Sequence, residues 1–600
     1  MKPKYLTGPL AGFSALLLCM ACEPSVTVHH LNNNEARLHF AANRDYLLLP
    51  VEDGAPNATL RFFTEDGGSR SIRVALAREA CDCTFPFDLR PYDGRKVVCE
   101  VTDCPYDAVC WEAMRLSDRI PAFAEEPFRP AYHHTPPYGW MNDPNGMVRE
   151  GDVYHLFYQH NPYGSRWENM SWGHAVSRNL LDWEELGVVL EPDSLGAVFS
   201  GCCVMDPQNT AGFGRNAMIA LYTASGARQT QCLAYSTDRG RTFTRYDGNP
   251  VLTSDRPDFR DPKVFYHDRT GRWIMVIAAG QAMEIHSSAN LRSWRFESRF
   301  GEEYGAHGGA WECPDLFELP VEGEPGQTRW VMLCSLGVED GSRVQYFVGD
   351  FDGRNFTPED DPDEVKWMDF GRDHYATVTW SGAPDGRRIA LGWMNNWAYA
   401  NEVPSVTFRG SNTLPRELGL RRVGGELLLT SVPAREAEKL LGEPFAVPAF
   451  AVETEHNVSP LPSGPAPAGR IELELEGGDA EVFGCKLFNC RGEYVDICFN
   501  RIEGTMLVDR SHSGRTDFSP AFAATRPVPF ASGGRSRLTF WIDRSSIELF
   551  VDGGERAATN LIYPSEPYDR MNFYAKGGTL HVKKLEISPL HPYKQKDSHE

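Results

Sequence analysis

Three acidic residues lie in short segments that could fix a carboxylate beside an uncharged, hydroxyl-rich molecule. In Trp140–Gly146, an indole, two side-chain amides and a proline-glycine pair surround Asp143. A fixed carboxylate, amides that bind hydroxyl groups and an aromatic wall are the groups that chemistry on such a substrate needs. The same letters form a strong turn sequence, in which Asp143 could bond to its own backbone. We therefore expect a tight turn here, either as a plain structural element or as part of an active site.

The other two carboxylates have equally unusual neighbours. Asp261 follows Arg260 and lies two positions before Lys263, and we expect these cations to hold its carboxylate ionised. Glu312 lies between an indole and a thiol. An apolar wall disfavours the charged form, so we expect Glu312 to have a raised pKa and to donate a proton. Each residue also has a purely structural explanation: Asp261 could belong to an Asp-Pro turn, and Glu312 could cap a strand.

The elements that must position these carboxylates are β-strands. Between residues 131 and 429, short apolar runs rich in Trp and Tyr recur at a spacing of roughly 55 to 65 residues. The strongest runs are 153–158, 218–222, 273–277, 330–334 and 388–392. Five such units predict a β-propeller, whose blades close radially and leave few free strand edges. A two-sheet sandwich is the alternative that the periodicity alone leaves open.

We place the candidate catalytic domain, the predicted propeller, at residues 125–435. Two further β regions flank it. Residues 28–115 alternate in short strands divided by Gly, Asp and Pro turns, which predicts a small N-terminal β-sandwich. Residues 445–590 alternate strictly, as in a half-buried antiparallel sheet, and predict a C-terminal β-sandwich packed against the middle domain. Helical patterns are scarce, so the predicted fold class is all-β.

The charge of the chain limits its partners. Sixty basic and eighty-two acidic residues give a net charge of −22. Nucleic acids and anionic membrane surfaces attract clustered Lys and Arg, and the sequence shows no basic run and no Gly-rich phosphate loop. An uncharged substrate fits this composition better than an anionic one.

The first 22 residues read as a secretory signal. Two Lys residues precede an apolar stretch, too short for a stable membrane span, that ends at Ala21-Cys22. A small residue before Cys is typical of bacterial lipoprotein cleavage sites. We therefore expect export to the periplasm or cell surface, with Cys22 lipidated as the only link to a membrane.

The cysteines are concentrated near the N-terminus of the exported chain. Five of the fifteen lie between residues 81 and 110. Export permits disulfide bonds there, but their connectivity cannot be read from sequence. The tight Cys81-Asp-Cys83 spacing argues against a structural zinc site.

Taken together, the three acidic segments resemble the acidic motifs of glycoside hydrolase family 32, the invertases, inulinases and levanases. Further segments that carry the resemblance, in the family's order, are 156–162, 172–175, 180–183, 199–201, 260–264, 312–317, 369–371 with 375–376, and 392–394 with Trp397. The resemblance spans about residues 130 to 590 and includes Ser546–Val551 near the C-terminus. It implies a five-bladed propeller followed by a β-sandwich, which agrees with the unit spacing.

The resemblance implies retaining hydrolysis of β-fructofuranosidic bonds, without a metal ion or an organic cofactor. Asp143 would be the nucleophile and Glu312 the general acid and base. Asp261 would bind two sugar hydroxyls more tightly as the ring flattens in the transition state. Carried over by position, the residues that line the fructose pocket would be Asn142, Gln159, Trp167, Phe199, Ser200, Arg260 and Trp397.

The chain departs from the family pattern at two places. Cys202-Cys203 follow the Phe-Ser-Gly motif where small residues are usual, either as inert packing thiols or as groups that reshape the pocket rim. The N-terminal β domain is absent from the basic enzyme. It looks like the accessory domain of some bacterial fructan hydrolases, a likeness carried by Phe87–Tyr92, and would act as a brace or a glycan-binding module.

The leading functional hypothesis is an exported fructan hydrolase that releases fructose from the chain ends of levan or inulin, with sucrose as a further candidate substrate. Trp140, Trp167 and Trp397 would wall such a pocket. Endo-levanase, invertase and fructosyltransferase activities stay open, as does the β-2,6 or β-2,1 linkage, because rim loops set these outcomes. No pattern in the sequence indicates an oligomeric state. A non-catalytic fructan-binding protein of the cell surface is the alternative from another class, which the complete carboxylate set disfavours.

Overall fold

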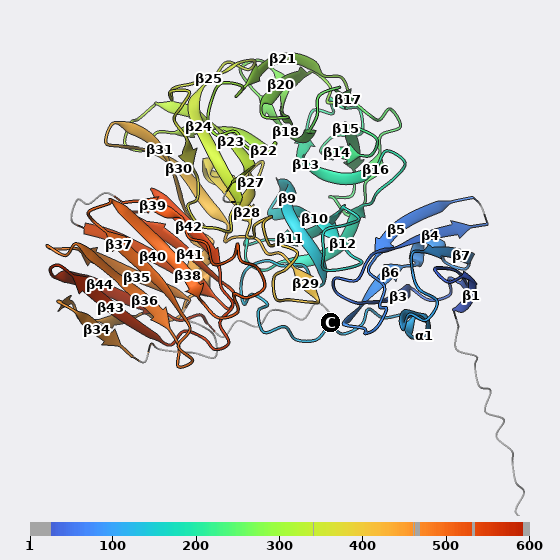
Figure 1. Cartoon of the computed structure of the whole chain (residues 1–600). Helices are drawn as coiled ribbons and strands as arrows, with labels where there is room; N and C mark the ends of the chain where they lie inside the picture. The colour runs from blue at the N-terminus through green and yellow to red at the C-terminus, as the bar shows by residue number, and fades with distance from the viewer. Residues whose placement is uncertain are drawn as a thin grey trace, which may run out of the picture. The chain divides into compact units, whose positions relative to one another are not determined.

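The structure is a computed structural model that describes residues 26–591 apart from 66, 340, 460, 462–468 and 531–534. The expected signal segment, including Cys22, lies outside the described residues. The described chain forms two compact units, Met1–Pro121 and Ala122–Glu600 (Figure 1). No helix within the described residues is both long and apolar enough to cross a membrane.

The all-β prediction is confirmed. Against 44 strands, the described residues contain only four short helical segments, namely α1 (Cys110–Ala113) and the 3-10 helices η1 (Arg90–Tyr92), η2 (Pro384–Gly386) and η3 (Arg435–Leu440). Gly, Pro and Asp divide the apolar runs into lengths that suit strands rather than helices.

The first unit is a small sandwich of two antiparallel sheets. One sheet has the order β1 (Thr27–Asn32), β2 (Glu35–Ala41), β7 (Lys96–Thr102), β4 (Ala58–Thr64) and β5 (Ser69–Val74). The other consists of β6 (Cys83–Asp88), β3 (Tyr46–Val51) and β8 (Arg115–Ser117). Alternate residues of β4 are buried, and the rings of Phe62 and Phe87 stack between the sheets at 4.0 Å. All thirteen described cysteines are free thiols, and the Sγ atoms of Cys104 and Cys110 lie 3.7 Å apart.

The second unit begins with the five-bladed propeller that the spacing predicted. The first two blades are β9 (Gly139–Glu150), β10 (Val153–Asn161), β11 (Ser171–Ser177), β12 (Glu184–Leu190) and β29 (Phe408–Arg409), then β13 (Ala197–Asp206), β14 (Ala217–Ser225), β15 (Gln229–Ser236), β16 (Thr244–Arg245) and β17 (Leu252–Thr253). The third and fourth are β18 (Phe259–His267), β19 (Arg272–Ala279), β20 (Met283–Ser288) and β21 (Arg295–Phe300), then β22 (Trp311–Pro320), β23 (Thr328–Val338), β24 (Gly341–Phe351), β25 (Phe356–Pro358) and β26 (Lys366–Trp367). The fifth is β27 (Tyr375–Thr379), β28 (Arg388–Trp393), β30 (Arg416–Val423) and β31 (Glu426–Pro433).

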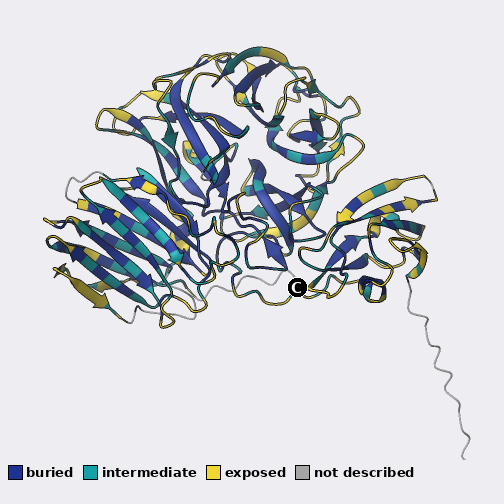
Figure 2. Cartoon of the chain, viewed as in Figure 1, coloured by how far each residue is buried: buried dark blue, intermediate teal, exposed yellow. Residues whose placement is uncertain are grey.

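Burial explains why the blades form. The second and third strands of a blade, such as β14 and β19, are buried along almost their whole length, because neighbouring blades cover both faces (Figure 2). Their apolar runs therefore do not alternate. The outer strand β12 is mostly exposed or half-buried.

Every innermost strand carries a β-bulge, in which one extra residue interrupts the pairing with the next strand. The register shifts lie between Met141 and Pro144 and between Asn145 and Val148 in β9, Val198 and Gly201 in β13, Arg260 and Lys263 in β18, Glu312 and Asp315 in β22, and Tyr375 and Val378 in β27. Such bulges re-aim side chains and are frequent beside active sites. Asp261, Cys313 and Ala376 adopt positive φ values of 64°, 46° and 53° there, a conformation that is unfavourable for side chains other than glycine.

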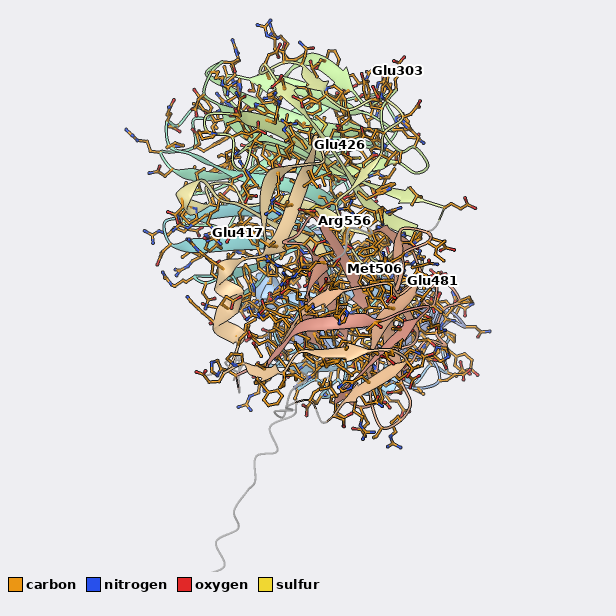
Figure 3. All side chains as sticks on the ribbon, turned by 90° about the vertical axis from the view of Figure 1, so that its left-hand side faces the viewer. Glu303, Glu417, Glu426, Glu481, Met506 and Arg556 are labelled. Atoms are coloured by element: carbon orange, nitrogen blue, oxygen red, sulfur yellow. The ribbon has the colours of Figure 1, made fainter. Side chains whose placement is uncertain are left out.

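A C-terminal sandwich completes the second unit. One sheet contains β32 (Phe445–Val447), β33 (Phe450–Val452), β44 (Leu580–Ser588), β35 (Arg470–Glu476), β40 (Arg535–Asp543), β41 (Ser546–Val551) and β42 (Arg556–Leu561). The other contains β34 (Glu455–Val458), β43 (Arg570–Lys576), β36 (Val482–Phe488), β37 (Tyr494–Asn500), β38 (Thr505–His512) and β39 (Pro527–Pro529). The inward residues of both sheets form one apolar core. In Figure 3, Glu417 and Glu426 mark the fifth blade, and Met506 and Glu481 mark this sandwich.

A buried ionic network joins the sandwich to the propeller. Arg416 of β30 donates to Glu548 of β41 (Nε–Oε2 3.1 Å) and to Asp369 (3.0 Å). His133 lies between Asp543 and Glu548, with each ring nitrogen 2.8 Å from a carboxylate oxygen. All five side chains are almost completely buried. Removing one member would leave an uncompensated charge in the interface, so the network fixes one arrangement of the two domains.

The free energy of unfolding should fall at alkaline pH because of His133. Burial disfavours the charged ring, but the hydrogen bonds and charges of Asp543 and Glu548 outweigh burial and raise the pKa to about 9. A raised folded-state pKa contributes stability that is complete below pH 6.5 and is lost as the pH rises towards 9. Denaturant titrations at pH 6 and pH 9.5 should differ by about 3 kcal/mol. The variant His133→Gln should lose this pH dependence; an unchanged dependence in that variant would assign it to another group.

Candidate active site

Three donors fix both oxygens of the Asp143 carboxylate. Asn142 Nδ2 donates to Oδ1 at 2.9 Å, and Ser200 Oγ and Cys313 Sγ donate to Oδ2 at 2.6 and 3.3 Å. Trp140 Nε1 in turn donates to Asn142 Oδ1 at 2.7 Å and orients that amide. The donors come from three different blades, so the direction of the carboxylate depends on the closed propeller.

The expectation of a tight turn around Asp143 is wrong. Residues Gly139–Glu150 form one continuous inner strand with two bulges, and Asn142 and Asp143 are the two residues of the first. Proline and glycine are compatible with a bulged strand, and Gly146 has a positive φ of 54° where an added Cβ would meet Phe157 at 2.4 Å. The sequence signal for a turn therefore marks a local break in the ladder.

Glu312 is a half-buried carboxyl with two donors. Arg260 donates to Oε1 through Nη2 at 3.0 Å and through Nε at 3.2 Å, and the Tyr375 hydroxyl donates to Oε2. Burial raises the pKa of Glu312, and the charge of Asp143 raises it further, whereas Arg260 and Tyr375 oppose the shift. The net direction is upward, as the sequence predicted. Glu312 can therefore hold a proton and, once it is ionised, find two donors in place.

Asp261 is buried beside the other two carboxyls. Its Oδ2 accepts from the Cys313 backbone N–H at 3.0 Å, and its own N–H donates to Thr223 Oγ1 at 3.0 Å. Burial raises its pKa to about 7; Arg260 opposes this, and the charges of Glu312 and Asp143 add to it.

The prediction that Arg260 and Lys263 hold Asp261 ionised is wrong for Lys263, and the lowering of the Asp261 pKa by Arg260 is outweighed by burial. Arg260 Nε lies 4.0 Å from Asp261 Oδ2, and its nearer partners are Asp258 and Glu312. Lys263 Nζ lies 2.8 Å from a carboxylate of the next blade, Asp315. The bulge between positions 260 and 263 turns the lysine away from Asp261.

The structure brings the three carboxyls together from β9, β18 and β22, at the same end of the inner strands. Each influences the protonation of another, since Asp143 raises the pKa values of both Asp261 and Glu312. The backbone and thiol of Cys313 connect Asp143 with Asp261. A cluster of three carboxyls, of which Asp261 and Glu312 have raised pKa values, can perform general acid and nucleophilic catalysis in the same site.

The remaining predicted pocket residues differ in how far they are exposed. Gln159 is buried and donates to the Val198 carbonyl at 3.0 Å, so it supports the bulge of β13. Trp167 and Trp397 are 41% and 38% exposed, which leaves indole surface open to a ligand. Trp167 meets Phe199 edge-on with a ring distance of 6.2 Å.

Trp140 cannot wall a pocket, contrary to the sequence prediction, because its side chain is completely buried. It stacks behind Trp397 at 5.9 Å and anchors Asn142.

The two cysteines at positions 202 and 203, where small residues are usual in the family, are packing thiols. Cys202 and Cys203 are buried in the cores between blades.

Sequence reasoning did not assign roles to Tyr375 and Thr223. Tyr375 follows a recognised motif, but its contact with Glu312 joins residues 63 positions apart. Thr223 lies in the middle of a buried strand, β14, where its hydroxyl donates to Gln231 Oε1 at 2.8 Å. Tyr375 lies in a segment that carries the family resemblance, whereas no local pattern marks Thr223.

Replacing Tyr375 by Phe should lower kcat by about 10-fold or more and shift the alkaline limb of the pH–rate profile upward. Without the hydroxyl, the Glu312 carboxylate loses a donor, and its pKa should rise further. A buried Tyr→Phe change keeps the ring packing. The matched control is Tyr346→Phe, a buried tyrosine of the fourth blade. An unshifted pH profile in Tyr375→Phe would exclude the hydroxyl from this role.

The chain matches two models of one family. Glycosyl hydrolases family 32 N-terminal domain matches residues 133–431, and Glycosyl hydrolases family 32 C terminal matches residues 438–589. A domain of unknown function, DUF4980, matches residues 32–132.

Curated relatives and solved structures agree with these matches. A levanase of Bacillus subtilis is 44% identical over 486 residues, covering 78% of this chain and 71% of that protein. An extracellular exo-inulinase of Aspergillus awamori is 34% identical over 511 residues, covering 77% and 94%. The crystal structure of exo-inulinase from Aspergillus awamori has a TM-score of 0.72 at 31% identity, over 78% of this chain and 99% of that one. A β-fructofuranosidase of Schwanniomyces occidentalis, complexed with fructosyl-erythritol, has a TM-score of 0.70 at 29% identity, over 77% and 97%.

Proposed function

The chain belongs to glycosyl hydrolase family 32, and from this premise we propose that it is a retaining glycoside hydrolase that cleaves the β-fructofuranosidic bonds of fructans. The relatives named levanase and exo-inulinase support this substrate class. The observation that carries the proposal is the convergence of Asp143, Asp261 and Glu312 from three inner strands, with a raised pKa at Glu312.

In the first step, an Asp143 oxygen attacks the anomeric carbon while the glycosidic C–O bond breaks. The proton of Glu312 moves to the departing oxygen, which leaves as a neutral alcohol. The products are a fructosyl ester on Asp143 and an ionised Glu312, whose charge Arg260 and Tyr375 stabilise by the hydrogen bonds described above.

In the second step, the Glu312 carboxylate takes a proton from water as the water oxygen attacks the anomeric carbon. The ester bond to Asp143 breaks, and fructose leaves with its configuration retained. Asp261 holds two sugar hydroxyls through both steps and binds them best when the ring is flattened. The reaction needs neither a metal ion nor an organic cofactor.

The pocket residues have chemistry that suits a furanose. Ser200 and Asn142 orient the nucleophile, and Arg260 donates to the acid, Glu312. Trp167, Phe199 and Trp397 offer partly exposed rings to the apolar edge of the sugar. Buried Gln159 supports the pocket from below. This enclosure favours release of fructose from chain ends.

Export fits the family relatives, one of which is named as extracellular. The lipidated N-terminus at Cys22 remains our proposal for how the enzyme is held at a membrane, on the basis of its Ala-Cys sequence after an apolar run.

Time-resolved product analysis with levan, inulin and sucrose tests the function. Fructose as the only early product is the expected result. Early oligosaccharides would replace exo action with endo-levanase action, and products longer than the substrate would indicate a fructosyltransferase. Binding of fructan without any product from the three substrates would favour the non-catalytic alternative and overturn the enzyme proposal.

A further inference from the structure

The inner strands enclose a second cavity, at the opposite end from the three carboxyls. It has a volume of about 700 Å³ and is lined by the C-terminal ends of the innermost strands, including Val148, Met205, His267 and Phe317. Ligand pockets in proteins commonly have volumes of ~300–1,000 Å³. The cavity is therefore large enough for a small organic molecule.

A buried ion pair separates this cavity from the catalytic carboxyls. Lys263 Nζ lies 2.8 Å from Asp315 Oδ2 and donates to the Thr379 carbonyl at 2.7 Å. The same Asp315 oxygen accepts from the backbone and hydroxyl of Thr379 at 2.7 and 2.8 Å. Lys263 borders both spaces. A ligand of the second cavity would thus be distinct from the sugar in the catalytic pocket.

The polar lining offers mainly donors. Among the described residues, Trp330 Nε1, Arg149 Nε and Arg388 Nε are buried N–H groups with no hydrogen-bond partner. Two further atoms of the lining are in the same condition, namely the acceptor Asp315 Oδ1 and the ring nitrogen His267 Nε2, which donates or accepts according to its tautomer. Trp330 is 7% exposed, so its indole N–H cannot turn to bulk solvent. Buried donors without acceptors are unfavourable, and a ligand with acceptor oxygens would satisfy them.

The charges of the lining point in the same direction. Arg388 lies 4.9 Å from the centre of the Phe317 ring, and its pKa is lowered by burial, with only Asp315 acting against this. Asp315 is already paired with Lys263. Neither Arg388 nor Arg149 forms an ion pair within the described part of the chain.

Two other charged groups of the lining have partners within the protein. Arg269 pairs with Glu318 at 2.7 Å, and Asp206 accepts from Thr210 and Ala211. The lining has equal numbers of cations and carboxylates, and Arg149 and Arg388 are its two cations without an ion-pair partner in the described part of the chain. Guanidinium groups bind carboxylates and phosphates by paired, charge-assisted hydrogen bonds.

The rest of the wall is aromatic. Phe265, Trp273 and Trp330 line the same space, and Trp273 Nε1 is already bound to Thr210 at 2.9 Å. These rings leave apolar surface for the carbon skeleton of a ligand. The ligand that fits both parts of the wall has an anionic oxygen group on a small organic body.

We propose that the cavity at the C-terminal ends of the propeller's inner strands is a binding site for a small organic oxyanion, a carboxylate or a phosphate monoester, held by Arg149, Arg388 and Trp330. This site is independent of the catalytic carboxyls and of the sugar that they bind.

Isothermal titration of the full exported enzyme with citrate, fructose 6-phosphate and inorganic phosphate tests the site at constant ionic strength. At least one of the three should bind with a Kd of about 1 mM or lower. Arg388→Gln should weaken this binding at least 10-fold. The control Arg422→Gln, at an exposed arginine paired with Glu324, should bind like the parent. Binding by citrate but not by phosphate or fructose 6-phosphate would identify a carboxylate site, and the reverse a phosphate site.

Trp330→Phe provides a second test, because it keeps an aromatic ring and removes the unpaired N–H. It should weaken binding severalfold, and saturating fructose should leave the binding of the anion unchanged. The proposal is overturned if none of the three probes binds below about 10 mM. It is also overturned if Arg388→Gln and Trp330→Phe bind like the parent, or if fructose competes with the anion.

Discussion

Asp143→Ala is expected to lower kcat on levan by about 10⁴-fold or more while the enzyme keeps its fold. The substitution removes the atom that would form the bond to fructose, and no neighbouring group can replace it, because Ser200 and Cys313 are directed at the carboxylate they would lose. Initial rates of fructose release measure the effect, and the melting temperature checks the fold. Because Asp143 is partly exposed to the pocket, its removal should change the melting temperature by only a few degrees.

Asp361→Ala is the matched control. It changes another Asp-Pro pair of the same domain, at an exposed position outside the site, and should leave kcat unchanged. Appreciable turnover by Asp143→Ala, with Asp361→Ala behaving like the parent, would remove Asp143 as the nucleophile.

Glu312→Ala is expected to lower kcat by about 10³- to 10⁴-fold, because both protonation of the leaving oxygen and activation of water would be lost. The nucleophile remains, so a fructosyl ester can still form slowly. Azide is a nucleophile that needs no general base, and it should intercept this ester. Added azide should therefore restore part of the rate and produce fructosyl azide with retained configuration, which product analysis by NMR can identify.

Two comparisons make this result specific. Glu318→Ala, on the same strand but outside the catalytic cluster, should show neither the loss of rate nor an effect of azide. Asp143→Ala should not be rescued by azide with retention. If azide gave the inverted product in Glu312→Ala, the double-displacement mechanism would be excluded.

The fold and the three carboxyls could be predicted from sequence because their signals are local. The five blades follow from apolar runs within each unit, and each acidic residue has distinctive immediate neighbours. Contacts across blades have no such signal. The pairing of Lys263 with Asp315 replaced the expected pairing with Asp261, although Lys263 is only two positions from Asp261 in sequence. Which side of a strand a residue faces depends on the bulges, and the sequence did not reveal them.

The burial of Trp140 illustrates the same limit. An indole beside a catalytic carboxylate suggests a pocket wall, but the strand turns Trp140 into the core, where it orients Asn142. Trp397, more than 250 positions later, provides the open ring instead. Residues brought together by closure of the propeller, such as Tyr375 and Glu312, can be found only when the blades are placed side by side.

The bulges of the five innermost strands make the active site sensitive to the length of each strand as well as to its side chains. Side chains alternate between the two faces of a strand, so deleting one bulge residue would restore a regular ladder and reverse the facing of every residue on one side of the deletion. In β18, a deletion at Pro262 would move either the catalytic Asp261 or the buried Lys263 to the wrong face. A substitution at one of these positions alters one side chain, whereas a one-residue deletion would reverse the facing of all the side chains on one side of it. Evolution or engineering of this scaffold should therefore proceed by exchange within the inner strands and should confine changes of length to the loops that connect them.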